Sequence, residues 1–281
     1  MKTLLLFVII LMSSPVFSQS KSDCCDLSAT QKFSDLGKDE DFRLKHPDPT
    51  PFDYSDMIGE MITFKTSDGK TANGYMVTHQ GNTIYNNWIL VFHEWYGLND
   101  YIKEESDKLH YETGANILAV DLYDGKVADN REDASKYMQS VDQTRAVNIV
   151  EGAIDYCGDN AKIGTIGWCF GGGWSLNAAL IAGVQADACV IYYGMPSDDV
   201  EKLKTLDCPV LGIFAEQDGH ITPEVVKQFE ENMAKAGKQL TVYMYDAGHG
   251  FANPSNPKHD KTATADAMSK TVAFFKEYLT N

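Results

Sequence analysis

The chain has 281 residues, of which 43% are apolar and 23% are charged, and this is the composition of an ordinary globular protein with a sizeable core. Its formal net charge is −16 at pH 7. Nucleic acids and anionic membrane surfaces select for basic patches, so this charge argues against both as partners.

The first 18 residues have the pattern of a secretory signal peptide. Lys2 supplies a positive charge, Leu4 to Met12 form an apolar run too short to span a bilayer, and Ser18 is a small residue at the expected cleavage site. An uncleaved anchor is the alternative. We expect residues 1–18 to be removed and the mature protein to be periplasmic or secreted, without a membrane partner.

Export affects how the six cysteines are interpreted, because thiols tend to pair in oxidising compartments. Cys24 and Cys25 are adjacent in a polar segment; either could pair with Cys157, or both could face solvent. Cys189 and Cys208 lie in or beside apolar segments, and we expect them to be structural. The sequence leaves the disulfide pattern open.

Residues 19–56 are polar and Pro-rich at 47–51, and they read as an N-terminal extension, partly helical near 28–36. Strands and helices alternate from Met57 without a repeat or a linker, so we expect one domain over 57–281. Strand patterns occur at 61–66, 73–79, 87–94, 116–123, 162–168, 188–194, 209–216 and 240–246. Helical patterns occur at 101–113, 131–138, 142–156, 172–181, 223–236 and 262–279.

The order of these elements predicts the fold class. The first two strands flank the turn sequence D-G-K and read as a hairpin, whereas several later strands are continuous apolar runs, typical of strands buried on both faces. Strands that alternate with helices form a mostly parallel sheet, here eight-stranded, with helices on both faces. In such α/β folds the reactive groups lie at the carboxyl ends of the strands.

Four reactive side chains meet that condition. Glu94, Cys169, Asp218 and His249 come at or just after the ends of the third, fifth, seventh and eighth strands. The last three occur in the order nucleophile, acid, histidine, which is the order of the α/β-hydrolase fold.

Cys169 lies in the sequence G-W-C-F-G, the nucleophile-elbow pattern with Cys in place of Ser. The two flanking glycines let the backbone close around the central residue, and the helix that follows favours a thiolate. A buried structural cysteine and a Gly-rich phosphate loop are the alternatives, but the patterns of nucleotide-binding loops are missing from the sequence. We interpret Cys169 as a nucleophile.

A nucleophilic thiol needs a base, and the base needs an orienting carboxylate. His249, between two glycines after the last strand, is the expected base, and Asp218 the expected orienting group. His220 and Asp246 are the respective alternatives. Four other histidines are expected at the surface: His46, His79, His110 and His259.

Glu94 lies in the sequence H-E-W-Y-G, which lacks the second histidine of the zinc motif H-E-x-x-H, so we expect no metal there. Its carboxylate is expected to accept a hydrogen bond from the thiol of Cys169 or to take its proton. A loop glutamate without a role is the alternative. The backbone N–H groups of Trp95 and Phe170 stand at the positions of an oxyanion hole.

The sequence resembles the dienelactone hydrolase family of α/β hydrolases over nearly all of residues 57–281. The resemblance is carried by the segments HEWYGLN, DLYDGK, GWCFGGG, YYG, AEQDGHITP and AGHGFAN. It implies a Cys169–His249–Asp218 triad whose resting thiol is neutral. It further implies that substrate binding frees Glu94 to remove the thiol proton, that the thiolate attacks an ester or lactone carbonyl, and that His249 then acts as acid and base while water releases the acyl group.

Two positions depart from the family members that act on dienelactone. Those members carry arginines where this chain has Gly125 and Asn253, so their clamp for a substrate carboxylate is not expected here. Lys126 lies one residue away and could substitute for one arginine. The residues expected to bind substrate are Lys126, Trp168, Tyr193 and Phe251.

The leading hypothesis is an exported, monomeric, cysteine-dependent hydrolase of small carboxylic esters or lactones that forms an acyl-cysteine intermediate and needs no cofactor or metal. The alternative is a non-catalytic binding or redox-sensing protein on the same scaffold, because an exported thiol is prone to oxidation. A thioesterase or peptidase of this fold is a third hypothesis.

Overall fold

The structure, a computed structural model, describes residues 33–79 and 86–279. The expected signal peptide, Cys24 and Cys25 lie outside the described residues. Eight strands form one sheet in the order β1-β2-β4-β3-β5-β6-β7-β8. Their bounds are β1 Glu60–Lys65, β2 Thr71–Val77, β3 Asn87–Phe92, β4 Asn116–Val120, β5 Lys162–Trp168, β6 Ala186–Tyr192, β7 Val210–Ala215 and β8 Leu240–Tyr245.

The pairs β1–β2 and β2–β4 are antiparallel and all the others are parallel, so the predicted α/β-hydrolase architecture is confirmed. All five residues of β4 and the last four of β3 are buried, because helices cover both faces of the central parallel strands. The edge strand β8 alternates between partly buried and exposed residues.

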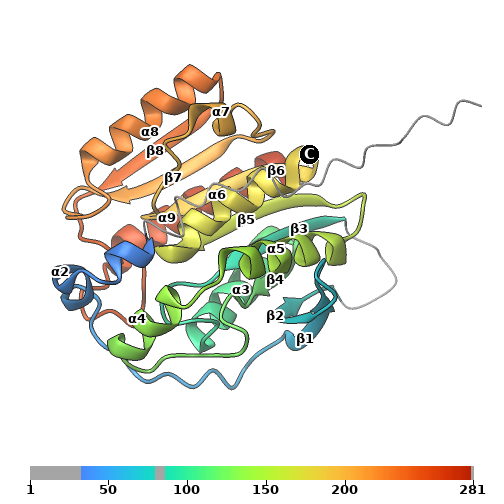
Figure 1. Ribbon diagram of the computed structural model, residues 1–281, viewed down its shortest axis with the longest axis horizontal. Helices are drawn as coiled ribbons and strands as arrows, with labels where there is room; N and C mark the ends of the chain where they lie inside the picture. Colours follow the sequence, from blue (N-terminus) through green and yellow to red (C-terminus); the bar gives the residue numbers. More distant parts are fainter. Residues whose placement is uncertain (1–32, 80–85, 280–281) are drawn as a thin grey trace, which may run out of the picture.

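The helices are α2 Glu40–Leu44, α3 Asp100–Thr113, α4 Arg131–Gln139, α5 Gln143–Cys157, α6 Phe170–Ala182, α7 Val200–Leu203, α8 Pro223–Ala236 and α9 Lys261–Leu279. Helices α3 and α9 contact each other on the sheet, as do α5 and α6 (Figure 1). The sequence did not predict α2 and α7, because each is too short to show an apolar period. No described helix is long and apolar enough to cross a membrane.

Helix α6 begins at Phe170, two residues before the predicted start at Gly172. The glycines there have low helix propensity, so the sequence pattern placed the start too late. The true start matters for the site, because the chain passes from β5 into α6 through the single residue Cys169.

The N-terminal segment 33–58 packs on the rest of the molecule. In Figure 1, α2 lies at the opposite side of the molecule from β1, and the chain between them runs along its edge. Phe33 and Phe42 are completely buried, although the segment as a whole is polar. The Tyr54 hydroxyl donates to Asp107 on α3 over 2.8 Å, and the carbonyl of Pro47 accepts from the Tyr96 hydroxyl. These contacts hold the segment across the carboxyl end of the sheet.

Candidate active site

Cys169 forms a sharp turn between β5 and α6, with backbone angles φ 53° and ψ −117°. A non-glycine residue rarely has a positive φ, and holding one there costs about 1–3 kcal/mol. The flanking glycines make the turn possible. A Cβ atom at Gly167 would overlap the carbonyl of Gly171, and a Cβ atom at Gly171 would overlap the carbonyls of Phe92 and His93. The turn therefore has the strained conformation expected of a nucleophile elbow.

His249 and Asp218 form a close pair in the loops after β8 and β7. Nδ1 of His249 donates to Oδ2 of Asp218 over 2.5 Å, and the other oxygen of Asp218 accepts the backbone N–H groups of His220 and Ile221. Burial raises the pKa of Asp218, but the neighbouring His249 and the hydrogen bonds outweigh it and lower the pKa to about 2. The carboxylate is therefore ionised at neutral pH, and it fixes the proton of His249 on Nδ1.

The two alternatives from the sequence do not have this arrangement. The ring of His220 lies against Phe42, with 5.0 Å between the ring centroids, and only its backbone reaches Asp218. Asp246 accepts a hydrogen bond from the side chain of Gln217 over 2.7 Å. The geometry thus selects His249 and Asp218 from the candidates.

The thiol of Cys169 is 1% exposed and faces the second ring nitrogen of His249. The Sγ atom and a ring nitrogen of His249 lie within 4.8 Å of each other. Because Nδ1 binds Asp218, the nitrogen that interacts with the thiol is Nε2, which has no other hydrogen-bond partner among the residues described. Burial raises the pKa of the Cys169 thiol, although the charge of His249 opposes the rise, so the thiol is neutral at rest. Burial also lowers the pKa of His249, but the Asp218 carboxylate raises it well above its ordinary range.

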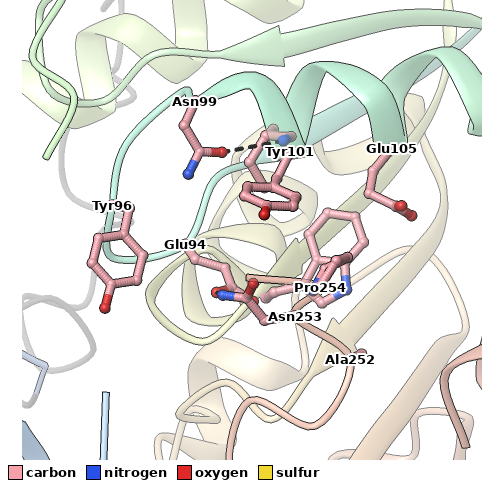
Figure 2. A pocket seen from close by; sticks show the side chains of 10 residues that line it. Glu94, Tyr96, Asn99, Tyr101, Glu105, Ala252, Asn253 and Pro254 are labelled. Atoms are coloured by element: carbon pink, nitrogen blue, oxygen red, sulfur yellow. Dashed lines mark hydrogen bonds between the residues drawn. The ribbon is translucent and has the colours of Figure 1, made fainter. Parts of the chain in front are cut away.

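Glu94 follows β3, and both of its carboxylate oxygens accept hydrogen bonds. The hydroxyl of Tyr193 donates to Oε1 over 3.0 Å, and the side-chain amide of Asn253 donates to Oε2. Figure 2 shows Glu94 and Asn253 directed toward each other. The expected hydrogen bond from Cys169 to Glu94 is not found among the described residues, because Tyr193 and Asn253 occupy the two oxygens. Burial nevertheless raises the pKa of Glu94 to about 7.

Asn253 also belongs to the site. The sequence showed only that this residue replaces an arginine of the family, and it did not indicate a contact with Glu94. Its Oδ1 atom accepts from the backbone N–H and the hydroxyl of Ser255, over 2.8 and 2.7 Å. These two bonds fix the orientation of the amide, so its NH₂ group faces Glu94. Asn253 therefore positions the Glu94 carboxylate.

His93, beside Glu94, uses both of its ring nitrogens within the fold. Nδ1 lies 2.6 Å from the carbonyl of Glu94, and Nε2 accepts the backbone N–H of Leu122 over 3.1 Å. This residue therefore has no free nitrogen for a metal, consistent with the incomplete zinc motif.

The two residues predicted to form the oxyanion hole lie near the thiol. Phe170 is the first residue of α6, so its N–H has no acceptor within that helix. Trp95 is buried in the loop after β3, and its ring stacks on His46, which lies 3.7 Å from the thiol. Their role as an oxyanion hole stays a prediction.

The prediction that His46 lies at the surface is wrong. This histidine, in the N-terminal segment, stacks on Trp95 with 4.7 Å between ring centroids, and its Nε2 atom lies 3.7 Å from the thiol of Cys169. Its Nδ1 atom lies 2.7 Å from the carbonyl of Phe42. Burial lowers the pKa of His46 to about 3, with a further contribution from His249, so its imidazole is neutral. No local pattern indicated this position, because it depends on how residues distant in sequence pack.

A larger and a smaller cavity open at the site, and they share Glu94, Tyr96 and Asn253 as lining residues. The smaller cavity contains Cys169 and His249. The larger is lined by Glu94, Tyr96, Asn99, Tyr101, Ile102, Glu105, Trp168, Ala252, Asn253 and Pro254 (Figure 2). No lysine or arginine of the described chain lines either cavity.

The four residues expected to bind substrate differ in how close they lie to the cavities. Trp168 lines the larger cavity, and Tyr193 reaches the site through its bond to Glu94. Phe251 is buried against Tyr193, with 5.6 Å between ring centroids. Lys126 is exposed and lines neither cavity; its ammonium lies 5.5 Å from the ring centroid of Tyr137. In this arrangement the expected substitution of Lys126 for a family arginine has no support.

Curated relatives and solved structures are similar to this chain over most of its length. It is 31% identical over 240 residues to Protein usf of Aquifex pyrophilus, and the aligned region covers 79% of this chain and all of that protein. It is 29% identical over 239 residues to a putative carboxymethylenebutenolidase of Aquifex aeolicus, again covering 79% of this chain and all of the relative.

Among solved structures, a dienelactone hydrolase-like promiscuous phosphotriesterase from metagenomic libraries superposes with a TM-score of 0.69 at 23% identity, over 79% of this chain and 99% of that one. A putative dienelactone hydrolase from Klebsiella pneumoniae gives 0.67 at 19% identity, over 78% and 100%. These two likenesses show the fold. The sequence profile of the dienelactone hydrolase family matches residues 73–279, and the chain belongs to that family.

Proposed function

We propose that this protein hydrolyses small, uncharged carboxylic esters or lactones through an acyl-cysteine intermediate on Cys169. One observation carries the proposal: the Asp218–His249 pair presents a buried Nε2 atom, with no partner other than the thiol among the described residues, toward a cysteine held at a strained elbow. The family supports hydrolysis of ester or lactone bonds, since several relatives are named carboxymethylenebutenolidases.

The first step of the proposed reaction is removal of the thiol proton from Cys169. Glu94 lines both cavities, so the carbonyl of a bound substrate can accept hydrogen bonds from Tyr193 and Asn253 in place of Glu94, which frees the oxygens of Glu94. With a pKa of about 7, Glu94 is poised to accept a proton near neutral pH. His249 also faces the thiol, and its imidazolium form stabilises the thiolate after Glu94 has taken the proton.

In the remaining steps His249 first donates a proton and then accepts one. The thiolate attacks the substrate carbonyl, and the N–H groups of Trp95 and Phe170 stabilise the oxyanion of the tetrahedral intermediate. The C–O bond to the alcohol breaks, and the alkoxide takes a proton from His249. Water then attacks the thioester while His249 takes one of its protons. The acid leaves, and the thiolate takes back the proton held by Glu94, which restores Cys169 as a thiol.

The charges at the cavities favour uncharged substrates. Glu94 and Glu105 are the charged side chains that line the larger cavity. Lys108 binds Glu105 over 2.8 Å, but no lysine or arginine of the described chain lines the cavity. A substrate carboxylate would meet like charge without a partner, which costs affinity. We infer that the protein prefers neutral esters or lactones over substrates that carry a carboxylate.

Hydrolysis of 4-nitrophenyl acetate by the wild type and by Cys169→Ala tests the proposal. We expect the variant to lose turnover, and Cys157→Ala, which removes a half-buried thiol elsewhere, to keep it. Equal rates for Cys169→Ala and the wild type would refute the nucleophile. A matched pair of aryl esters, with a methyl group or a carboxylate at the same position, tests the preference; a lower kcat/KM for the methyl ester would contradict it.

We also propose that the mature enzyme is exported, because residues 1–18 have the charge and apolar pattern of a signal peptide. Sequencing the N-terminus of protein from fractionated cells tests this. Cleavage near Ser18 in the exported fraction is expected, and an uncleaved cytoplasmic chain would contradict it.

A further inference from the structure

Three metal-ligating side chains converge at the mouth of the elbow. Within residues 33–79 and 86–279, one donor atom each of His46, Cys169 and His249 lies within 4.8 Å of the other two. The proposed reaction uses two of these groups and leaves His46 without a task. His46 also lies outside residues 73–279, the part of the chain that matches the family. The cluster is therefore a feature that the N-terminal segment adds to the site.

The spacing of these donors suits a tetrahedral ion. With Zn–S near 2.3 Å and Zn–N near 2.0–2.1 Å, a sulfur and a nitrogen on one tetrahedral zinc lie about 3.6 Å apart. The Sγ atom of Cys169 and Nε2 of His46 are 3.7 Å apart. A ring nitrogen of His249 lies within 4.8 Å of both donor atoms, and a small shift of the ring brings Nε2 to the same spacing.

Both histidines already have the outer contacts of metal-bound imidazoles. Ligating histidines usually donate their second ring N–H to a carboxylate or a backbone carbonyl, which leaves the other nitrogen free for the metal. His249 donates Nδ1–H to Asp218 over 2.5 Å, and Nδ1 of His46 lies 2.7 Å from the carbonyl of Phe42. Each Nε2 atom is thereby directed into the cluster. Nε2 of His46 carries a lone pair, and Nε2 of His249 carries a proton that a metal ion would displace.

A second, independent observation points to a ligand at this place. The side chain of His249 is 4% exposed, and its Nε2 atom has no hydrogen-bond partner in the described chain. Its one neighbour there is the thiol of Cys169, a weak hydrogen-bonding group, so a bound ligand would satisfy this buried nitrogen better than the thiol does. The Asp218 carboxylate behind His249 and Glu94 beside the cavity offset part of the charge of a cation.

We propose that His46, Cys169 and His249 bind one Zn²⁺ or a similar borderline-soft divalent ion, and that this ion reversibly inhibits the enzyme. Binding replaces the S–H bond of Cys169 with a Zn–S bond and the N–H bond at Nε2 of His249 with a Zn–N bond. Two protons go to solvent, and no oxidation state changes. A thiolate and two imidazoles leave the fourth position of a tetrahedral ion to water. The ion occupies the nucleophile and its base together, and it ties the N-terminal segment to the elbow.

Calorimetric titration of metal-free protein with Zn²⁺ tests the site without substrate, so its result does not depend on the proposed reaction. We expect one ion per chain, and at least about tenfold weaker binding in both His46→Ala and His46→Gln. The Gln variant keeps a polar side chain of similar size, so it guards against a folding defect in the Ala variant. His79→Ala, which removes a histidine elsewhere, should bind like the wild type. Mg²⁺, which prefers oxygen ligands, should not bind.

Co²⁺ provides a spectroscopic readout of the same site. The wild type should show a thiolate-to-cobalt charge-transfer band that is lost in Cys169→Ser. In ester hydrolysis, Zn²⁺ should inhibit the wild type until a chelator is added, and His46→Gln should resist inhibition relative to its own metal-free rate. Equal Zn²⁺ affinity in wild type and both His46 variants, or a cobalt complex without the thiolate band, would overturn the proposal.

Discussion

Replacing Asp218 by Asn tests the assignment of the base most sharply, because the change is almost isosteric. The Asn carbonyl oxygen can keep the hydrogen bonds from the backbone N–H groups of His220 and Ile221, which Oδ1 of Asp218 now accepts. Its NH₂ group then faces Nδ1 of His249. That nitrogen must become an acceptor, so the imidazole proton moves to Nε2, the atom directed at Cys169.

The size of the effect follows from this tautomer. A neutral His249 with its proton on Nε2 cannot take a proton from water, and it loses the carboxylate that stabilises the imidazolium. The same substitution in serine-protease triads lowers kcat by about 10⁴, or about 5 kcal/mol in activation free energy. We expect a loss of this order in kcat. KM should change little, because Asp218 lines neither cavity.

Steady-state hydrolysis of 4-nitrophenyl acetate by purified Asp218→Asn measures both constants, and circular dichroism checks the fold. Asp246→Asn is the matched control, because that carboxylate lies on the neighbouring loop and bonds Gln217 instead of His249. It should keep kcat within about twofold, since it touches no reacting group. A folded Asp218→Asn enzyme with more than about a tenth of wild-type kcat would refute the reasoning.

Three further predictions concern pH and the backbone of the elbow. Because the pKa of Glu94 is about 7, kcat/KM should rise with pH through that value, and this rise should vanish in Glu94→Gln. In Tyr193→Phe the carboxylate loses a hydrogen bond, so the rise should move to higher pH. Identical pH profiles in the wild type and the variants would contradict this. The fold lowers the pKa of Asp218 from 3.8 to about 2, so its carboxylate contributes about 2 kcal/mol to the free energy of unfolding. This contribution is complete above pH ~4 and is lost as the pH falls toward 2. The free energy of urea unfolding should therefore differ less between pH 6 and pH 3 in Asp218→Asn than in the wild type. Gly171→Ala should lower the free energy of unfolding by about 3 kcal/mol or more through overlap with backbone carbonyls, against about 1–2 kcal/mol for Gly114→Ala, where φ is +71° and the space is open; equal losses would argue against the overlap.

Much of the fold could be predicted because its signals are local. The central strands are continuous apolar runs, and burial on both faces requires that composition. The strand-end rule placed Cys169, Asp218 and His249 together, since parallel strands bring their carboxyl ends to one edge whatever the separation in sequence. The close pairing of His249 with Asp218 follows from that topology.

The rest of the site depends on contacts that no local pattern encodes. His46 reaches the thiol because Phe42 packs against Trp95 and His249 and so anchors the N-terminal segment. That segment is polar and has no regular apolar pattern that would predict this packing. The position of Glu94 likewise depends on Asn253, which lies far along the chain. The sequence could identify Glu94 as reactive, but its partners required the packed structure.

The most direct test of the central claim is detection of the acyl-cysteine intermediate. Mixing 4-nitrophenyl acetate with His249→Ala, which should acylate slowly and deacylate more slowly still, and mapping the peptides by mass spectrometry shows where the acyl group resides. The proposed mechanism predicts one acetyl group, on Cys169. An unmodified Cys169 in a protein that still releases nitrophenol, or a label on another residue, would contradict it.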